Sequence, residues 1–176
     1  MGSAAHREAF RAMRRAGLTR VGTAPRPELG ENPLFLGCHP FRTTQASSPV
    51  DTKVAFGPWM AQRLGEALVT PTDPEEGDIA RAVDAARGHS ALVLGTYNAH
   101  VKRGQLRLLA ALAGLGLPMA CVALRDPYDL AALPENVYGL AAYEYNIESL
   151  DTVAQALAGD FTPAGRLPVP LEGGQP

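Results

Sequence analysis

The sequence has few of the residues that mark specialised classes of protein. It holds 2 cysteines in 176 residues, and its formal net charge is only -2. Cys38 and Cys121 each lie in or beside an apolar run, which fits small buried thiols in a reducing compartment better than a disulfide framework. A nearly balanced charge gives no electrostatic reason to expect nucleic acid or an acidic membrane as a partner.

Long hydrophobic runs are also scarce. The longest candidate covers residues 108–124, and its 17 uncharged residues are at the lower limit for crossing a bilayer. Gly114, Gly116 and Pro118 divide this run into a helix and a strand. The opening residues, MGSAAHREAF, lack the apolar core of a secretory signal. We therefore expect a cytoplasmic protein without a membrane partner.

Several functional motifs are absent from the sequence. It contains no GxGxxG, GxxxxGK[ST], CxxC or GxSxG pattern, which argues against dinucleotide, phosphate, zinc and serine-hydrolase sites. A polar loop after the first buried strand does carry hydroxyl groups, but they are far from the next helix: Thr43, Thr44, Ser47 and Ser48. We expect no cofactor at that loop, because a phosphate site needs a turn that leads directly into a helix.

Histidine and cysteine are not arranged for a metal or a nucleophile. The four histidines fall in different elements, with no i,i+4 pair: His6, His39, His89 and His100. Cys38 and His39 are adjacent, so their side chains point to opposite faces of a strand. We therefore expect no metal site, no catalytic Cys–His pair and solvated or capping histidines.

What the sequence does contain is an alternation of helical and strand patterns. Helices are expected at residues 5–17, 58–68, 73–88, 104–116 and 146–159, and strands at 33–37, 67–71, 90–96, 118–125 and 137–143, with a helical turn at 126–133. In the first helix we expect Ala9, Phe10 and Met13 to pack and the arginines to face water. This alternation predicts an α/β fold with a doubly wound, mostly parallel sheet and helices on both faces.

Local signals define the helix ends. Asp73, Pro74 and Glu76 have the spacing of an N-cap, a first-turn proline and the glutamate of a capping box. Asn146 is expected to cap the last helix, and Gly159 to end it. The apolar strands at 90–96 and 118–125 should be covered on both faces, which places Leu94 in the core together with Val93, Val122 and Leu124.

In a doubly wound sheet, functional loops leave the carboxyl ends of the strands. These loops begin at Cys38, Gly95, Arg125 and Tyr143. They carry the candidate ligand-binding residues Thr96, Tyr97, Asn98, His100, Arg125, Asp126, Tyr128 and Glu144. Asn98 and His100 could hydrogen-bond a sugar that stacks on the Tyr97 ring. The alternative is that Asn98 caps a turn, Tyr97 packs and His100 is solvated.

Carboxylates also follow the strands, at Asp126, Asp129, Glu135 and Glu144. A glycosidase holds a carboxylate pair on either side of the bond that it cleaves. Aspartate before or within a turn is more often a turn former or a helix cap, Asp126 before Pro127 especially. The sequence leaves both interpretations open.

Several segments together resemble a known family. LVLGTYNAH, GQLRLLAAL, VALRDPYDLAALPE and YEYNIESLDTVAQALAGDFTPAGRLPV follow the order, and nearly the spacing, of the C-terminal α/β-sandwich domain of glycoside hydrolase family 3. The bacterial β-N-acetylhexosaminidases are the most similar branch. AHREAFRAMRRAGLTRV resembles the helix and strand that begin this domain. Asp126 stands where the family usually has asparagine, and Arg103-Gly104 where it has a Pro-Gly turn.

The resemblance implies a flavodoxin-like sandwich that packs, in complete enzymes, on a TIM-type barrel carrying the nucleophilic aspartate. The barrel motifs do not occur in these 176 residues, so we expect no catalytic residue here. In the glucosidase branch the sandwich supplies a glutamate as acid/base, whereas the hexosaminidase branch uses a histidine of the barrel. The implied division is a helix and lead-in segment at 1–32, the sandwich at 33–171 and a flexible tail at 172–176.

Three functions follow from these observations. The first is a non-catalytic domain of a family 3 β-N-acetylhexosaminidase, partnered by a separate barrel chain or by another copy of itself. The second is an independent module that binds an amino sugar or another small molecule at the strand-end loops. The third is an enzyme that acts by itself.

Overall fold

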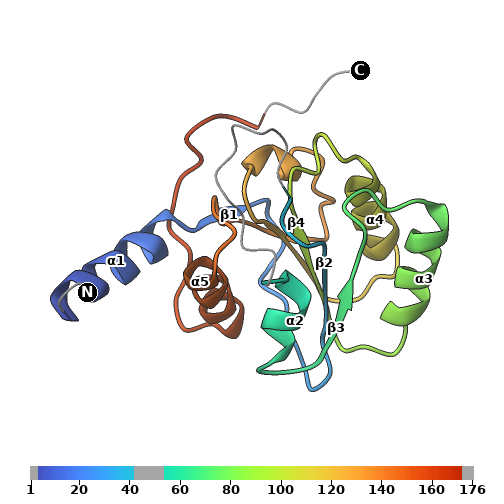
Figure 1. The fold of residues 1–176 in the computed structure, drawn as a ribbon, viewed down its shortest axis with the longest axis horizontal. Helices are drawn as coiled ribbons and strands as arrows, with labels where there is room; N and C mark the ends of the chain where they lie inside the picture. The colour runs from blue at the N-terminus through green and yellow to red at the C-terminus, as the bar shows by residue number, and fades with distance from the viewer. Residues whose placement is uncertain (1–3, 42–53, 172–176) are drawn as a thin grey trace.

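A computed structural model describes residues 4–41 and 54–171 (Figure 1). Two expectations from the sequence lie outside these residues. One is the exclusion of a phosphate site at Thr43, Thr44, Ser47 and Ser48, and the other is the tail at 172–176.

One six-stranded sheet forms the centre of the fold, with the strand order β1-β6-β5-β4-β2-β3. The strands are β1 (Thr19–Val21), β2 (Leu34–Gly37), β3 (Glu66–Val69), β4 (Leu92–Thr96), β5 (Met119–Ala123) and β6 (Tyr138–Ala141). β2 to β6 run parallel, and β1 pairs antiparallel with β6 at one edge. β2 lies between β3 and β4 in the sheet, as the first strand does in flavodoxin-like sheets. The predicted doubly wound α/β fold is confirmed.

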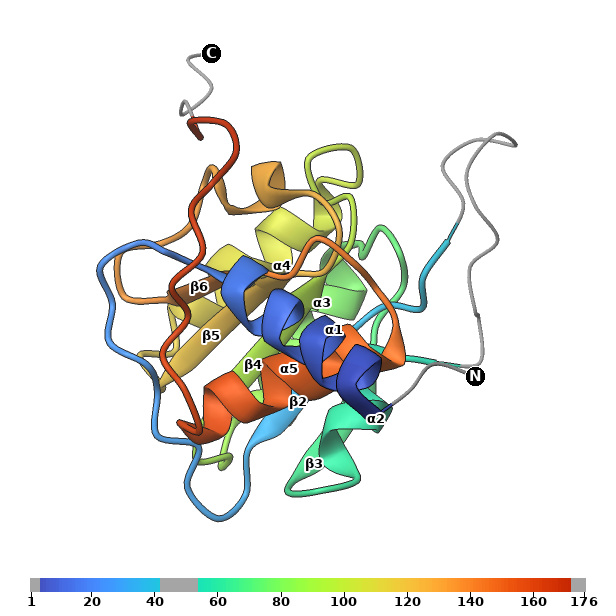
Figure 2. The ribbon, with the colours of Figure 1, turned by 90° about the vertical axis from the view of Figure 1, so that its left-hand side faces the viewer.

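The helices cover both faces of this sheet (Figure 1). They are α1 (Ala4–Gly17), α2 (Phe56–Ala61), α3 (Glu76–Ala86), α4 (Gly104–Ala113) and α5 (Ile147–Ala158), with a 3-10 turn η1 (Pro127–Leu130). α3 and α4 pack on one face, and α2 and α5 on the other. α1 lies over α5 (Figure 2) and extends beyond the body of the domain (Figure 1). The helix and strand expected at the start of the chain are therefore present as α1 and β1.

Two apolar layers sandwich the central strands. Leu92 and Leu94 pack toward α3 and α4, whereas Val93, between them, packs toward α2 and α5. Adjacent strand residues point to opposite faces, so an unbroken apolar run is required where both faces are covered. Val93, Leu94, Val122 and Leu124 are each at most 1% exposed, which confirms the predicted core.

The predicted cap of α3 is wrong by two residues. Glu75 is the N-cap, and it forms a reciprocal capping box with Asp78. Asp73 has another role, because its Oδ1 accepts a hydrogen bond from the Gly104 N–H at 2.8 Å. A helix start read from local spacing cannot reveal that a carboxylate is engaged by a different helix. At α5, the Asn146 cap and the left-handed Gly159 are confirmed.

The helix predicted at residues 58–68 extends beyond the end of the observed helix α2. α2 ends at Ala61, and the chain turns at Gly65, whose φ is +81°. A Cβ at Gly65 would lie 2.1 Å from the carbonyl oxygen of Pro33, so only glycine fits this approach. The following residues pair with β2 as strand β3, and this ladder outweighs their helical periodicity.

The predicted packing face of α1 is also wrong. Phe10 and Met13 are 46% and 69% exposed. Arg14 turns inward instead, and its Nη1 bonds Ser149 Oγ at 2.6 Å and pairs with Glu144 at 2.8 Å. α1 therefore docks on α5 through a charged and polar contact, which leaves its apolar side chains in solvent.

No helix in the described ranges is long and apolar enough to cross a membrane. Residues 108–124 are divided as predicted, because α4 ends at Ala113 and β5 begins at Met119.

The central strands generate a stability prediction. Leu94→Ala should lower the free energy of unfolding by about 2–5 kcal/mol, because the deletion leaves a cavity in a closed apolar layer. Leu64→Ala is the matched control, since Leu64 is 40% exposed and should cost less than about 1 kcal/mol. Urea unfolding of both variants measures the difference. Equal losses would contradict the packing described here.

Candidate functional site

The carboxyl ends of β2 and β4 form the switch point of the sheet, where doubly wound folds usually bind ligands. Here β2 continues into Cys38, and β4 ends at Thr96 and continues into Tyr97. We call the loops that follow β2, β4, β5 and β6, beginning at Cys38, Tyr97, Leu124 and Ala142, the carboxyl-edge loops. All of the candidate ligand residues except Thr96, the last residue of β4, lie in these loops.

Aromatic side chains fill the crevice at the switch point. Tyr97 is 3% exposed, and its ring meets Phe41 and Tyr145 edge-on at centroid distances of 5.2 and 5.5 Å. The Tyr145 hydroxyl donates to the Cys38 carbonyl at 2.9 Å and accepts from the Phe56 N–H at 2.6 Å. Burial raises the pKa of Tyr145 well above its usual value.

The expected stacking face is therefore not available. Tyr97 packs among aromatic rings, and Thr96 is fully buried, with its hydroxyl directed to the Val122 carbonyl at 3.5 Å. Of the two alternatives for this stretch, the structure favours packing for Tyr97 over sugar stacking.

Gln105, which the sequence analysis did not select, holds this crevice closed. Its Oε1 accepts from the Tyr97 N–H at 2.9 Å, and its Nε2 donates to the carbonyls of Thr72 and Tyr97 at 2.8 and 3.1 Å. The side chain is only 2% exposed. One signal could have revealed it: Gln105 shares a helical stripe with Leu108, Leu109 and Leu112, so a polar residue occupies a core position.

Asn98 adopts a left-handed backbone, with φ 53°. Its carbonyl accepts from the N–H groups of Val101 and Lys102, both at 3.0 Å. Asparagine tolerates this conformation better than most residues. Asn98 therefore begins a turn through its backbone carbonyl, and its buried Nδ2 has no partner within the described ranges.

His100 is not simply solvated. Its Nδ1 and its backbone nitrogen each lie 3.0 Å from Asp129 Oδ1. Asp129 is fully buried, and its other oxygen has no partner among the described residues. From the sequence, Asp129 could be a glycosidase carboxylate or a turn former, and no local pattern reveals its pairing with a residue 29 positions away in the chain. Its buried carboxylate instead fixes the orientation of the His100 ring.

Two other candidates gather beside His100. Asp126 caps η1 by accepting from the Tyr128 N–H at 3.1 Å, and its Oδ2 lies 4.0 Å from His100 Nε2. The Tyr128 ring is 6.4 Å from the His100 ring between centroids.

The remaining two candidates, Arg125 and Glu144, have other partners. Arg125 is exposed and reaches the hydroxyl of Tyr97 at 3.4 Å. Glu144 pairs with Arg14 and lines a different hollow of about 290 Å³. The loops thus bring together only part of the predicted set.

The cysteines are free and buried, as predicted. Burial raises the pKa of the Cys38 thiol to about 12, and it also raises the pKa of Cys121. His39 is exposed while Cys38 is buried, so the two side chains do not form a pair. Among the described residues, no group of three or more histidine, cysteine or acidic side chains could hold a metal ion.

Gln105 generates a prediction about the closed crevice. Gln105→Met should lower the free energy of unfolding by at least about 2 kcal/mol, because it leaves the Tyr97 N–H and two carbonyls buried without partners. Gln155→Met is the control, since the Gln155 side chain bonds, among the described residues, only the exposed Arg15 side chain. Thermal unfolding of both variants measures the effect, and equal midpoints would show that the Gln105 amide does not hold the loop.

The Cys38 thiol generates a pH prediction. An unfolded thiol loses its proton near its ordinary value of 9.0, whereas the folded one holds it to about 12. Between pH 9 and about pH 12 the unfolded chain therefore binds fewer protons at Cys38 than the folded chain does. The contribution of Cys38 to the free energy of unfolding falls as pH rises through this range. Cys38→Ala should show a shallower loss of unfolding free energy between about pH 8 and 11. Parallel pH profiles of the two proteins would contradict the assigned burial.

Comparison with solved structures shows where this fold occurs. A glycoside hydrolase family 3 β-N-acetylglucosaminidase from Paenibacillus sp. str. FPU-7 aligns with 99% of this chain and 34% of its own, at TM-score 0.81 and 20% identity. A fungal multi-domain β-N-acetylglucosaminidase of the same family aligns with 99% of this chain and 20% of its own, at TM-score 0.77 and 20% identity. A β-glucosidase from Listeria innocua aligns with 92% of this chain and 26% of its own, at TM-score 0.66 and 16% identity.

No protein-family model matches the sequence, and no curated protein matches it. The chain spans about a third of the Paenibacillus enzyme and less of the other two. Its fold is that of a domain-sized region within glycoside hydrolase family 3 enzymes.

Proposed function

We propose that this chain is the non-catalytic α/β-sandwich domain of a family 3 β-N-acetylhexosaminidase-like glycoside hydrolase. It packs against a catalytic barrel that is carried on the same polypeptide or on another. The observation that carries the proposal is the alignment of 99% of this chain with only 34% of a β-N-acetylglucosaminidase. A region of that size is a domain of an enzyme rather than the whole of it.

The acidic side chains support an accessory role. Retaining glycosidases hold two carboxyl groups about 5–5.5 Å apart across the bond that they cleave. Asp129 is buried against His100, Asp126 caps η1, and Glu144 is paired with Arg14. Each of these groups thus has a structural partner, which favours an accessory domain over an independent hydrolase.

The carboxyl-edge loops offer a surface for the barrel. Val101 is 60% exposed, and Arg125 is exposed on the neighbouring loop. β4 and β5, which lead into these loops, are adjacent in the sheet. Exposed aliphatic and arginine side chains on adjacent loops are a combination that becomes favourable when a partner covers them.

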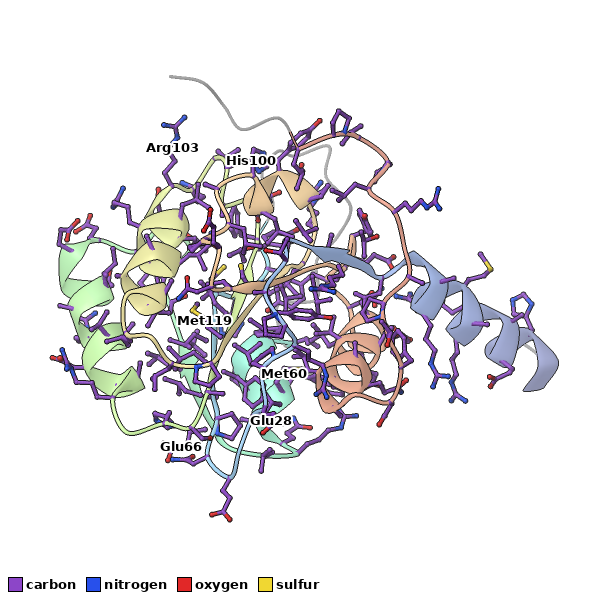
Figure 3. All side chains as sticks on the ribbon, turned by 180° about the vertical axis from the view of Figure 1, so that it is seen from behind. Glu28, Met60, Glu66, His100, Arg103 and Met119 are labelled. Carbon is purple, nitrogen blue, oxygen red and sulfur yellow. The ribbon has the colours of Figure 1, made fainter. Side chains whose placement is uncertain are left out.

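Association is the test of this proposal. The chain should co-purify in equal amounts with a tagged family 3 barrel from the same genome. Val101→Asp should weaken this association at least tenfold, because a carboxylate would be buried in an apolar contact. Leu64→Asp is the matched control, since Leu64 is 40% exposed and precedes Glu66 at the opposite end of the domain (Figure 3). Affinity is measured by calorimetry.

Two outcomes would overturn the proposal. One is failure to bind any barrel of that genome while the chain remains folded. The other is turnover of an aryl β-N-acetylglucosaminide by the isolated chain that survives repurification and disappears in Glu144→Gln.

A further inference from the structure

A hollow of about 800 Å³ opens beside η1 and α4, on the outer side of the His100 loop. Figure 3 places His100 and Arg103 at the same end of the domain, opposite Glu66 and Glu28. We call this space the α4–η1 hollow. Its floor is apolar, formed by Leu106, Ala110, Ala131 and Ala132. Its volume is within the range of small-molecule sites.

The rim of the hollow carries nitrogen donors. His100, Arg103 and Arg107 line it. The Arg103 side chain makes no hydrogen bond or ion pair within the described ranges, so its guanidinium is free to turn toward a ligand. Among the described residues, the Arg107 side chain has two contacts, 3.3 Å to the Pro74 carbonyl and 3.8 Å to Glu76. The apolar floor and the cationic rim fit a ligand that is anionic at one end and hydrocarbon at the other.

The His100 ring is held in place for such a ligand. Asp129 is fully buried, and its Oδ1 accepts from both Nδ1 and the backbone nitrogen of His100. Turning the ring away would leave the buried Asp129 carboxylate with one donor, the His100 backbone N–H, in place of two, which disfavours that movement. With Nδ1 directed to Asp129, Nε2 is the nitrogen left for a ligand, and it donates to an anion in the imidazolium form of the ring. The Tyr128 ring, 46% exposed, stands beside it.

Asp126 limits the charge that the site accepts. Its Oδ2 lies 4.0 Å from His100 Nε2. A dianionic head group would meet this carboxylate at close range, whereas a monoanion divides its contacts between His100 and the arginines. We propose that the α4–η1 hollow binds a small amphiphilic monoanion, a carboxylate with a short apolar chain. The hollow shares the loops that follow β4 and β5 with the proposed barrel contact, so binding is tested on the chain alone, without a barrel.

Octanoate is the probe. Titration into the isolated chain, followed by amide chemical shifts, should move resonances of residues 98–110 and 126–132 with one saturating affinity. Octanamide lacks the negative charge and tests the cationic rim. Acetate lacks the apolar chain and tests the apolar floor. Octyl phosphate has a dianionic head group and tests the limit that Asp126 sets on charge. Each of the three should bind at least about fivefold more weakly than octanoate.

Variants locate the binding. Ala110→Phe should fill the hollow and abolish saturable binding, whereas Ala80→Phe, an exposed alanine of α3, should not change it. Arg103→Gln should weaken binding about fivefold, and Arg87→Gln, an exposed arginine outside the hollow, should leave it unchanged. Circular dichroism confirms that each variant is folded.

Three results would overturn the proposal. They are no saturable shifts at millimolar octanoate, equal affinity for octanamide, and binding that survives Ala110→Phe. None of these measurements involves a barrel. A result that overturns the ligand proposal therefore leaves the accessory-domain proposal untouched.

Discussion

Burial of β4 and β5 on both faces is the constraint on which the rest of the structure depends. These strands have no solvated side, so each of their residues must be apolar or small, and helices must cover both layers. Parallel neighbours can be joined only by crossovers, which return the chain to the same edge of the sheet each time. The carboxyl-edge loops therefore gather at one end as a consequence of packing, whatever their function.

At the carboxyl end of the sheet, side chains fill the switch point, where folds of this topology usually bind ligands. Gln105 ties the Tyr97 backbone to Thr72, and the rings of Phe41, Tyr97 and Tyr145 occupy the switch point. A buried amide with all of its bonds made stabilises such a plug, because opening it would strand several polar groups. The polar side chains that remain accessible lie outside the switch point, on the loop that carries His100 and on η1.

This arrangement fits the accessory role that we propose. The solved structures that share the fold are longer chains, and the identity with them is 20% or less in the three comparisons described above. A two-sided apolar sheet tolerates extensive substitution while its pattern and volume are kept, which explains how the fold persists at that identity. Loop residues are not under this packing constraint, so the surface chemistry of each chain must be argued from its own side chains.

The sequence by itself determined the order of helices and strands after residue 32, the parallel sheet, the central core and the Asn146 and Gly159 helix ends, whereas strand β1 has no periodicity that predicts it. These features follow from periodicity and from backbone preferences that act within a few residues. The tertiary structure decided the rest. Gly65 forms its turn because Pro33 lies against it, Asp73 serves α4 instead of α3, and Arg14 turns inward to meet α5. At the site, the sequence located the loops but could not show that Tyr97 is covered or that Asp129 holds His100. Those facts depend on contacts between residues far apart in the chain, which no local pattern encodes.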